Sequence, residues 1–253
     1  MEANTEQRSP VISVKNLHKI YEIGENKVHA LAGVDFTINR GEFCMIVGTS
    51  GSGKSTLLNM LAGLEKPTEG QIVIAGEHIE NLNESKLVIF RQKHVGFIFQ
   101  SYNLLANMDA VENVATPLMF QGVSKKERTR RAINMLTSVG LKKYLDHTPG
   151  QMSGGQQQRV GIARALVVEP EIIFADEPTG NLDSNTSMEV MNLMQRIARE
   201  KKQTIVMVTH DNNLAEFGDK IIRIIDGKIV ELIDNREKAR MLYEERKQKI
   251  NHE

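Results

Sequence analysis

Short apolar segments alternate with helix-length patterns along most of the chain. Several of the apolar segments are rich in β-branched residues and are bounded by glycine or by charge, which is typical of strands. Between them, apolar positions recur three and four residues apart, as in 125–138 and 186–200, which predicts helices with one buried face. This alternation predicts layered α/β structure. The expected strands are 11–14, 43–47, 71–75, 95–99, 172–175, 204–208 and 221–225.

The stretch from 101 to about 155 breaks the alternation. It contains no convincing strand, and apolar residues recur at helical spacing at Val111, Val114 and Leu118, then at Ile133 and Leu136. We therefore expect a helical subdomain, about 101–160, inserted in a core that spans 11–233. Outside this core we expect a flexible N-terminus at 1–10 and a charged, solvated helical tail at 234–253.

The composition is that of an ordinary globular protein. The 253 residues are 40% hydrophobic and 25% charged, which argues against a disordered, collagen-like or disulfide-rich chain. Lys and Arg number 32, as do Asp and Glu, so the net charge is zero and no global field favours nucleic acid or anionic lipid. A single cysteine, no apolar run of about 18 residues and a polar N-terminus without a secretory signal predict a cytosolic location.

The strongest motif directly follows the apolar segment at 43–47. It matches the G-x-x-x-x-G-K-[ST] pattern of a phosphate-binding loop. Glycines let backbone N–H groups approach a triphosphate, and the helix expected near Lys54 points its positive end at the same place. We expect Lys54 to contact the β- and γ-phosphates and Ser55 to bind Mg²⁺. A glycine-rich turn that only joins a strand to a helix is the alternative, which the Lys-Ser ending disfavours. The candidate nucleotide-binding residues here are Gly48, Thr49, Ser50, Gly51, Ser52, Gly53, Lys54, Ser55 and Thr56.

Two acidic residues follow another apolar segment, 172–175. Asp176 at the end of a buried strand would hold Mg²⁺ through its water shell, because magnesium prefers few protein carboxylates. Glu177 would then polarise the attacking water as a general base. A solvated strand end is the alternative for consecutive acids, and Pro178 together with the preceding phosphate-binding loop makes it less convincing.

Two further polar residues end expected strands. His210 comes just after 204–208 and could contact the γ-phosphate, although a lone histidine there is more often structural. Gln100 ends 95–99, where its amide can reach Mg²⁺ or the water while it senses the neighbouring helical subdomain. Neither residue would be informative alone.

A second expected anion site lies at Ser153, Gly154, Gly155 and Gln156, which open a helix. A hydroxyl and two glycine amides at a positive helix end favour an anion. One chain with one phosphate-binding loop has no obvious use for a second anion site, unless that site completes the nucleotide site of another copy.

Taken together, these motifs resemble the ATP-binding cassette of ABC transporters. The resemblance covers nearly all of 11–231 in family order: Tyr21 as the adenine-stacking aromatic, the phosphate-binding loop, Gln100, the Ser153 motif, Asp176 and Glu177, then Asp183 and His210. One departure is Met152, where the family usually has leucine; the two side chains have similar volume, so we expect little effect on packing.

The resemblance implies a P-loop NTPase core of the RecA-like α/β class, with an antiparallel β subdomain and an inserted α-helical subdomain. It implies ATP and Mg²⁺ as ligands and a head-to-tail homodimer, in which ATP lies between the loop of one subunit and the Ser153 motif of the other. In this family Glu177 would be the catalytic base, His210 would contact the γ-phosphate, Gln100 would link the site to the membrane partner, and Asp183 would signal across the interface.

Within the family, the chain looks like the branch of lipoprotein-release, macrolide-export and cell-division cassettes. That branch implies a separate integral membrane permease subunit, and so a position on the cytoplasmic face of the cell membrane, with no nucleic acid as a partner. A soluble cassette that acts in repair, translation or iron-sulfur assembly is the alternative, disfavoured by a single cassette without heptads. A nucleotide-binding regulator without turnover is disfavoured by Glu177 and His210. The sequence does not indicate the cargo.

Overall fold

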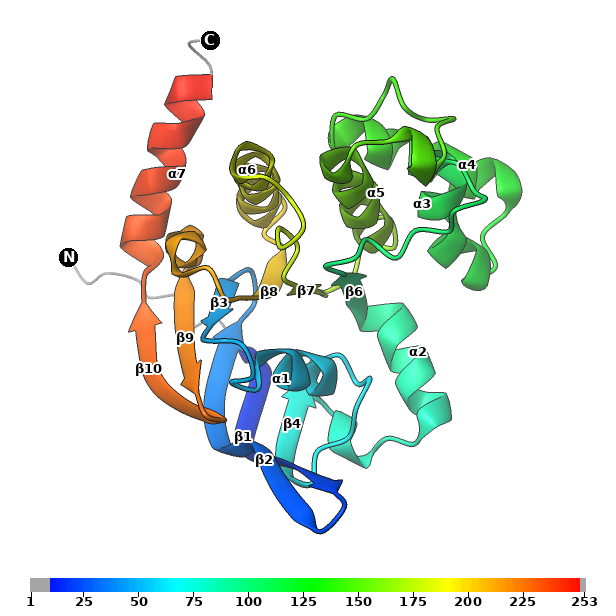
Figure 1. Cartoon of the computed structure of the whole chain (residues 1–253). Helices are drawn as coiled ribbons and strands as arrows, with labels where there is room; N and C mark the ends of the chain where they lie inside the picture. Colours follow the sequence, from blue (N-terminus) through cyan, green and yellow to red (C-terminus); the bar gives the residue numbers. More distant parts are fainter. Residues whose placement is uncertain (1–9, 251–253) are drawn as a thin grey trace, which may run out of the picture.

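The computed structural model describes residues 10–250 and contains two β-sheets (Figure 1). The larger sheet has six strands in the order β10-β9-β3-β8-β7-β6, of which β10 alone runs antiparallel to its neighbour. These strands are β3 (Phe43–Val47), β6 (Val95–Ile98), β7 (Ile172–Asp176), β8 (Thr204–Thr209), β9 (Lys220–Ile225) and β10 (Lys228–Asp234).

The smaller sheet is antiparallel and has the order β2-β1-β4-β5. Its strands are β1 (Pro10–Ile23), β2 (Asn26–Asn39), β4 (Glu69–Ile74) and β5 (Glu77–His78). All seven strands expected from sequence are present, whereas β2, β5 and β10 were missed. Both β2 and β10 expose many of their residues, so they lack the continuous apolar run that marks a strand buried on both faces.

The described part also contains seven α-helices and three short 3₁₀ turns, all of which lie between strands except α7, which follows the last strand. Helices α3, α4 and α5 pack against one another at the upper right of Figure 1, and α5 also packs on β6 and α6; these three helices are called the helical lobe. The helices are α1 (Lys54–Leu61), α2 (Glu84–His94), α3 (Ala110–Phe120), α4 (Lys125–Ser138), α5 (Gly154–Leu166), α6 (Ser184–Glu200) and α7 (Arg236–Ile250), and the 3₁₀ turns are η1 (Ile79–Asn81), η2 (Pro149–Gln151) and η3 (Asn212–Phe217). The sheets and helices confirm the expected fold class, a P-loop NTPase core with an antiparallel β-sheet and added helices.

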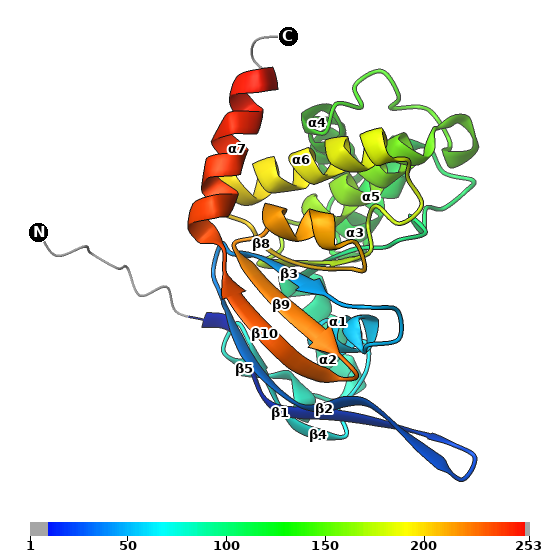
Figure 2. The ribbon, with the colours of Figure 1, turned by 60° about the vertical axis from the view of Figure 1, so that its left-hand side comes forward.

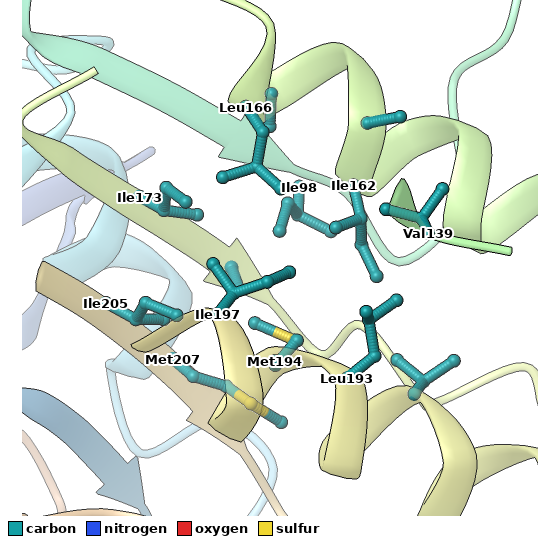
Figure 3. Packing of buried hydrophobic residues seen from close by; sticks show 14 of the residues in the cluster. Ile98, Val139, Ile162, Leu166, Ile173, Leu193, Met194, Ile197, Ile205 and Met207 are labelled. Atoms are coloured by element: carbon teal, nitrogen blue, oxygen red, sulfur yellow. The ribbon is translucent and has the colours of Figure 1, made fainter. Parts of the chain in front are cut away.

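The central strands separate two hydrophobic cores. Cys44 and Ile46 of β3 face one core, whereas Phe43, Met45 and Val47 face the other, because side chains alternate across a strand. Figure 3 shows the second core, where strand residues from β7 and β8 meet α5 and α6. Since both faces are covered, the strands read as unbroken apolar runs.

The parallel arrangement of the strands determines where the polar residues that follow them lie together. Strand β8 lies between β3 and β7, and its register pairs Thr209 with Val47 and Val208 with Asp176. The carboxyl ends of all three strands therefore meet at one edge of the sheet. Ligands bind at such edges in open α/β folds.

The charged tail forms a helix, as expected, and most of its described residues are exposed, but one of its faces also packs on the rest of the chain. Helix α7 stands beside the end of α6 and η3 (Figure 2). The Ala239 side chain is fully buried, and the Arg246 guanidinium lies 3.9 Å from the Phe217 ring centroid. Arg246 also donates hydrogen bonds to Gln195 and Glu216, both at 3.2 Å. Residues 1–9 of the expected flexible N-terminus, and 251–253 of the tail, lie outside the described residues.

Within residues 10–250, none of the helices combines the length and the apolar character that crossing a bilayer requires.

We predict that Arg246→Ala destabilises the protein by about 1–2 kcal/mol, because it removes a cation–π contact and two charge-assisted hydrogen bonds. Urea unfolding measures this change. Gln248→Ala, an exposed position one residue beyond Lys247, is the matched control and should shift the unfolding midpoint little. Equal effects of the two substitutions would show that α7 is not held by Arg246.

Candidate functional site

The backbone of the loop between β3 and α1 surrounds a space that suits a phosphate group. Gly51 and Gly53 have φ angles of 79° and 99°, which glycine adopts without strain. A side chain at Gly48 would clash with the Ile224 carbonyl, and one at Gly53 with the Ala30 carbonyl. No side chain caps the N-terminus of α1, so its first backbone N–H groups are free to bind an anion.

Lys54 lies inside this loop. Its side chain is only 4% exposed, and its Nζ donates to the Thr49 carbonyl at 2.7 Å. Burial lowers the pKa of Lys54, and the carboxylates of Glu177 and Asp176 act against this shift. The Ser52 hydroxyl is also buried, without a hydrogen-bond partner among the described residues. A cation and an unpaired hydroxyl, both beside free N–H groups, fit a bound phosphate chain.

Ser55 and Asp176 meet beside the loop. The Ser55 hydroxyl donates to Asp176 Oδ1 at 3.1 Å. Burial raises the pKa of Asp176 above its usual value, and the hydrogen bond from Ser55 opposes that shift. A divalent cation would offset the cost of the buried carboxylate, and a hydroxyl with a carboxylate oxygen is a donor set that suits Mg²⁺. The described residues hold no group of three or more His, Cys, Asp or Glu placed for a metal, so water and phosphate oxygens would complete the shell.

Glu177 follows Asp176 in an unusual conformation. Its φ angle is 42°, which non-glycine residues rarely adopt, and its N–H donates to the Val208 carbonyl at 3.1 Å. The carboxylate lies 2.9 Å from Nδ1 of His210, the residue that follows β8. The structure therefore brings Glu177 and His210 together as a hydrogen-bonded pair next to Lys54 and Asp176.

Gln100 lies slightly apart from this group. A side chain at Gly180 would come within 2.6 Å of Gln100 Nε2, and the Asn181 side chain donates to the Gln100 carbonyl at 3.1 Å. Across the part that the structure describes, the Gln100 side chain forms no hydrogen bond to Ser55 or Asp176. Gln100 thus contacts the turn that follows Glu177, and its predicted role as a metal ligand stays a prediction.

Tyr21 reaches the first turn of α1 from β1. Its hydroxyl donates to Glu65 at 2.9 Å, and Thr56 is a second hydrogen-bonding neighbour. Burial raises the pKa of Tyr21. Lys19 Nζ lies 5.1 Å from the ring centroid. The ring is therefore placed close to the phosphate-binding loop, and its role as an adenine-stacking residue stays a prediction.

The Ser153 motif begins α5, in the helical lobe. Ser153 and Gln156 form a reciprocal capping box, with the Ser153 hydroxyl accepting from the Gln156 N–H at 3.3 Å. Figure 1 shows α5 well separated from α1, which packs on β2, β7 and β8. One chain therefore presents two helix N-termini in different lobes.

Asp183 lies on the same side as the Ser153 motif. It caps α6 by accepting hydrogen bonds from the N–H groups of Asn185 and Thr186, and the Thr186 hydroxyl donates to it at 2.6 Å. These hydrogen bonds lower the pKa of Asp183. The Thr186 methyl group also packs closely on Gly155, where a side chain would clash with it.

Two residues near the motif were missed by sequence reasoning. Tyr102 places its hydroxyl 2.8 Å from where a side chain at Gly154 would begin, and Thr186 covers Gly155. The paired glycines signal a close approach by some neighbour. Nothing in the sequence says which residue that neighbour is.

Comparison with known proteins shows the family to which the chain is similar. Residues 31–180 match the family model described as ABC transporter. The lipoprotein-releasing system ATP-binding protein LolD of Psychrobacter arcticus is 46% identical over 220 residues, which cover 87% of this chain and 97% of LolD. The macrolide export ATP-binding/permease protein MacB of Hyphomonas neptunium is 45% identical over 91% of this chain, which corresponds to 36% of MacB.

A solved structure is similar as well. The ATP-binding cassette MJ0796, in a dimeric post-hydrolysis state bound to ADP and Pi, has a TM-score of 0.82 and 43% sequence identity, and the match covers 89% of this chain and 99% of that one. MJ0796 comes from Methanocaldococcus jannaschii. With a matching family model, close relatives and a bound-nucleotide neighbour, the chain belongs to the ABC transporter family, as an ATP-binding cassette that hydrolyses ATP with Mg²⁺.

Proposed function

We propose that two copies of this chain associate head to tail and bind two ATP molecules between them. The observation that carries this proposal is the separation of the two anion-binding helix ends within one chain. Lys54 and the free N–H groups of α1 surround one phosphate site, while Ser153 lies at the start of α5, in another lobe (Figure 1). A second copy, turned about a twofold axis, supplies Ser153 to the first copy's nucleotide.

The residues of the phosphate-binding loop would hold the nucleotide and exclude water. Lys54 and the backbone amides contact the β- and γ-phosphates, and Tyr21 stacks on the adenine. Ser55 and Asp176 would bind Mg²⁺, which neutralises phosphate charge when bound. Closure of the dimer from 1:99 to 99:1 needs about 5.5 kcal/mol, or about 2.7 kcal/mol for each of two nucleotides. A few charge-assisted hydrogen bonds of about 1.5–3 kcal/mol each are enough.

Glu177 would accept the proton of the attacking water. Its hydrogen bond to His210 would fix the carboxylate orientation, and we propose that the histidine also contacts the γ-phosphate when ATP is bound. Gln100 packs against the turn that follows Glu177. It would therefore couple the position of the helical lobe to the position of the reacting groups. Loss of the γ-phosphate removes the hydrogen bonds that hold two copies together.

The membrane partner would dock on the helical lobe. A groove of about 200 Å³ between α3 and α4 has a partly apolar lining that includes Met108, Val111, Ala115 and Met119, of which Met119 is 44% exposed. A short cytoplasmic helix of a permease fits such a groove. The relatives LolD and MacB favour a permease of the lipoprotein-release, macrolide-export or cell-division kind, and so a position at the cytoplasmic face of the membrane. A membrane protein that copurifies with the chain would identify the partner.

We predict that Glu177→Gln lowers ATP turnover at least about 100-fold, because it removes the proton acceptor. Binding of ATP should persist, so the variant should form a dimer with ATP that size-exclusion chromatography detects. Glu169→Gln is the control, since that side chain is 83% exposed and lies beyond α5. Turnover of Glu177→Gln close to wild type would refute the base assignment.

We predict that Asp176→Asn abolishes Mg²⁺-dependent hydrolysis yet stabilises the nucleotide-free protein at pH 7, by about 0.5–1 kcal/mol. The gain is small because Asp176 is half-buried and solvent screens its charge. Burial raises the pKa of Asp176, so the folded wild type loses stability as pH rises through that pKa, whereas the amide does not titrate.

Urea unfolding of both proteins from acidic to neutral pH measures this difference. The advantage of the asparagine variant should grow as the pH rises. A variant that is less stable than wild type at pH 7 would contradict the claim that Asp176 is held there for metal binding at a cost to folding.

A further inference from the structure

The loop after Gln100 contains two successive residues in the left-handed region. Tyr102 has a φ angle of 59° and Asn103 one of 49°. Residues other than glycine are disfavoured in this region, and a tyrosine more than an asparagine. Two such residues in a row persist only where neighbouring groups hold them.

Arg164 of α5 holds both residues. Its Nη1 donates to the Asn103 carbonyl at 2.6 Å, and its Nη2 donates to the Tyr102 carbonyl at 2.8 Å. The planar guanidinium presents two parallel donors, which suits two adjacent carbonyl oxygens. Burial lowers the pKa of Arg164, so these hydrogen bonds are made in a partly desolvated place where they are stronger.

The loop that Arg164 holds touches both halves of the proposed site. On one side, Gln100 packs against Gly180 and receives a hydrogen bond from Asn181, in the turn after Glu177. On the other side, the Tyr102 hydroxyl lies over Gly154 of the Ser153 motif. Tyr102 itself provides one of the two carbonyls that Arg164 binds, and only Ser101 separates it from Gln100.

We propose that Arg164 is a positioning residue for ATP hydrolysis, which acts by holding the 100–103 loop in its left-handed conformation between Gln100 and the Ser153 motif. Because α5 belongs to the helical lobe, a movement of the lobe either carries Gln100 with it or breaks the two hydrogen bonds. Through Arg164, the position of Gln100 therefore depends on the position of the lobe. This inference rests on the roles proposed above for Gln100 and Ser153.

The test compares Arg164→Ala and Arg164→Lys with wild type. Arg131→Ala is a matched control, because Arg131 lies in the same lobe and donates to a backbone carbonyl, that of Val167, at 2.8 Å, without touching the 100–103 loop. Three measurements are made on the full chain: kcat, the affinity for MgATP at protein concentrations too low for dimers, and hydrogen exchange of the Tyr102 and Asn103 amides.

For Arg164→Ala we expect kcat to fall about tenfold or more, since small misplacements of positioning groups are costly. MgATP affinity should stay within about twofold of wild type, because the phosphate-binding loop is untouched. Exchange at Tyr102 and Asn103 should rise about tenfold while the α5 amides stay protected. Arg164→Lys, which keeps one donor group but not the fork, should be intermediate in kcat, and Arg131→Ala should leave kcat and loop exchange near wild type.

An unchanged kcat in Arg164→Ala, or a fall in kcat without faster loop exchange, would overturn the proposal, as would an equal loss in Arg131→Ala. If Arg164→Ala does not fold, Arg164→Lys decides, and wild-type kcat there would overturn the proposal. Failure of the proposed function is distinguishable, because Lys54→Ala and Ser153→Ala proteins would then recover no activity on mixing, whatever the Arg164 variants show.

Discussion

The burial of the Lys54 ammonium is the constraint on which the rest of the structure depends. A cation inside a glycine-rich loop, with one backbone carbonyl as its hydrogen-bond partner, is costly until an anion arrives. Its charge is balanced at longer range by Asp176 and Glu177, which the parallel strands deliver to the same edge of the sheet. The site is therefore organised around a bound triphosphate and its metal before either is present.

One copy of the chain provides groups on only one side of this nucleotide site. Lys54, Asp176 and Glu177 lie together near the carboxyl ends of the parallel strands, whereas Ser153 and Asp183 lie in or beside the helical lobe, where their side chains cap helices within their own chain. Both Ser153 and Asp183 are exposed, so both helix ends are accessible to a second copy. The proposed pairing of two copies gives those ends a ligand, and it gives ATP the role of joining the subunits.

The sequence predicted those parts of the fold that are determined within a single segment of the chain. Strands buried on both faces are unbroken apolar runs, and the Gly48–Ser55 motif, Asp176 and Glu177 follow such runs directly. Strand β10 was missed because it is mostly exposed. The docking of α7 was missed because Arg246, a charged residue, provides the packing. The contact of Arg164 with the 100–103 loop was also invisible, since a left-handed tyrosine has no sequence signature.

The central claim is that each reaction site combines groups from two copies, and mixing two inactive variants tests it most directly. Lys54→Ala and Ser153→Ala proteins are assayed separately and then as an equal mixture. Each mixed dimer would contain one intact site, so the mixture should recover about a quarter of the wild-type sites. A mixture no more active than its two components would contradict the account.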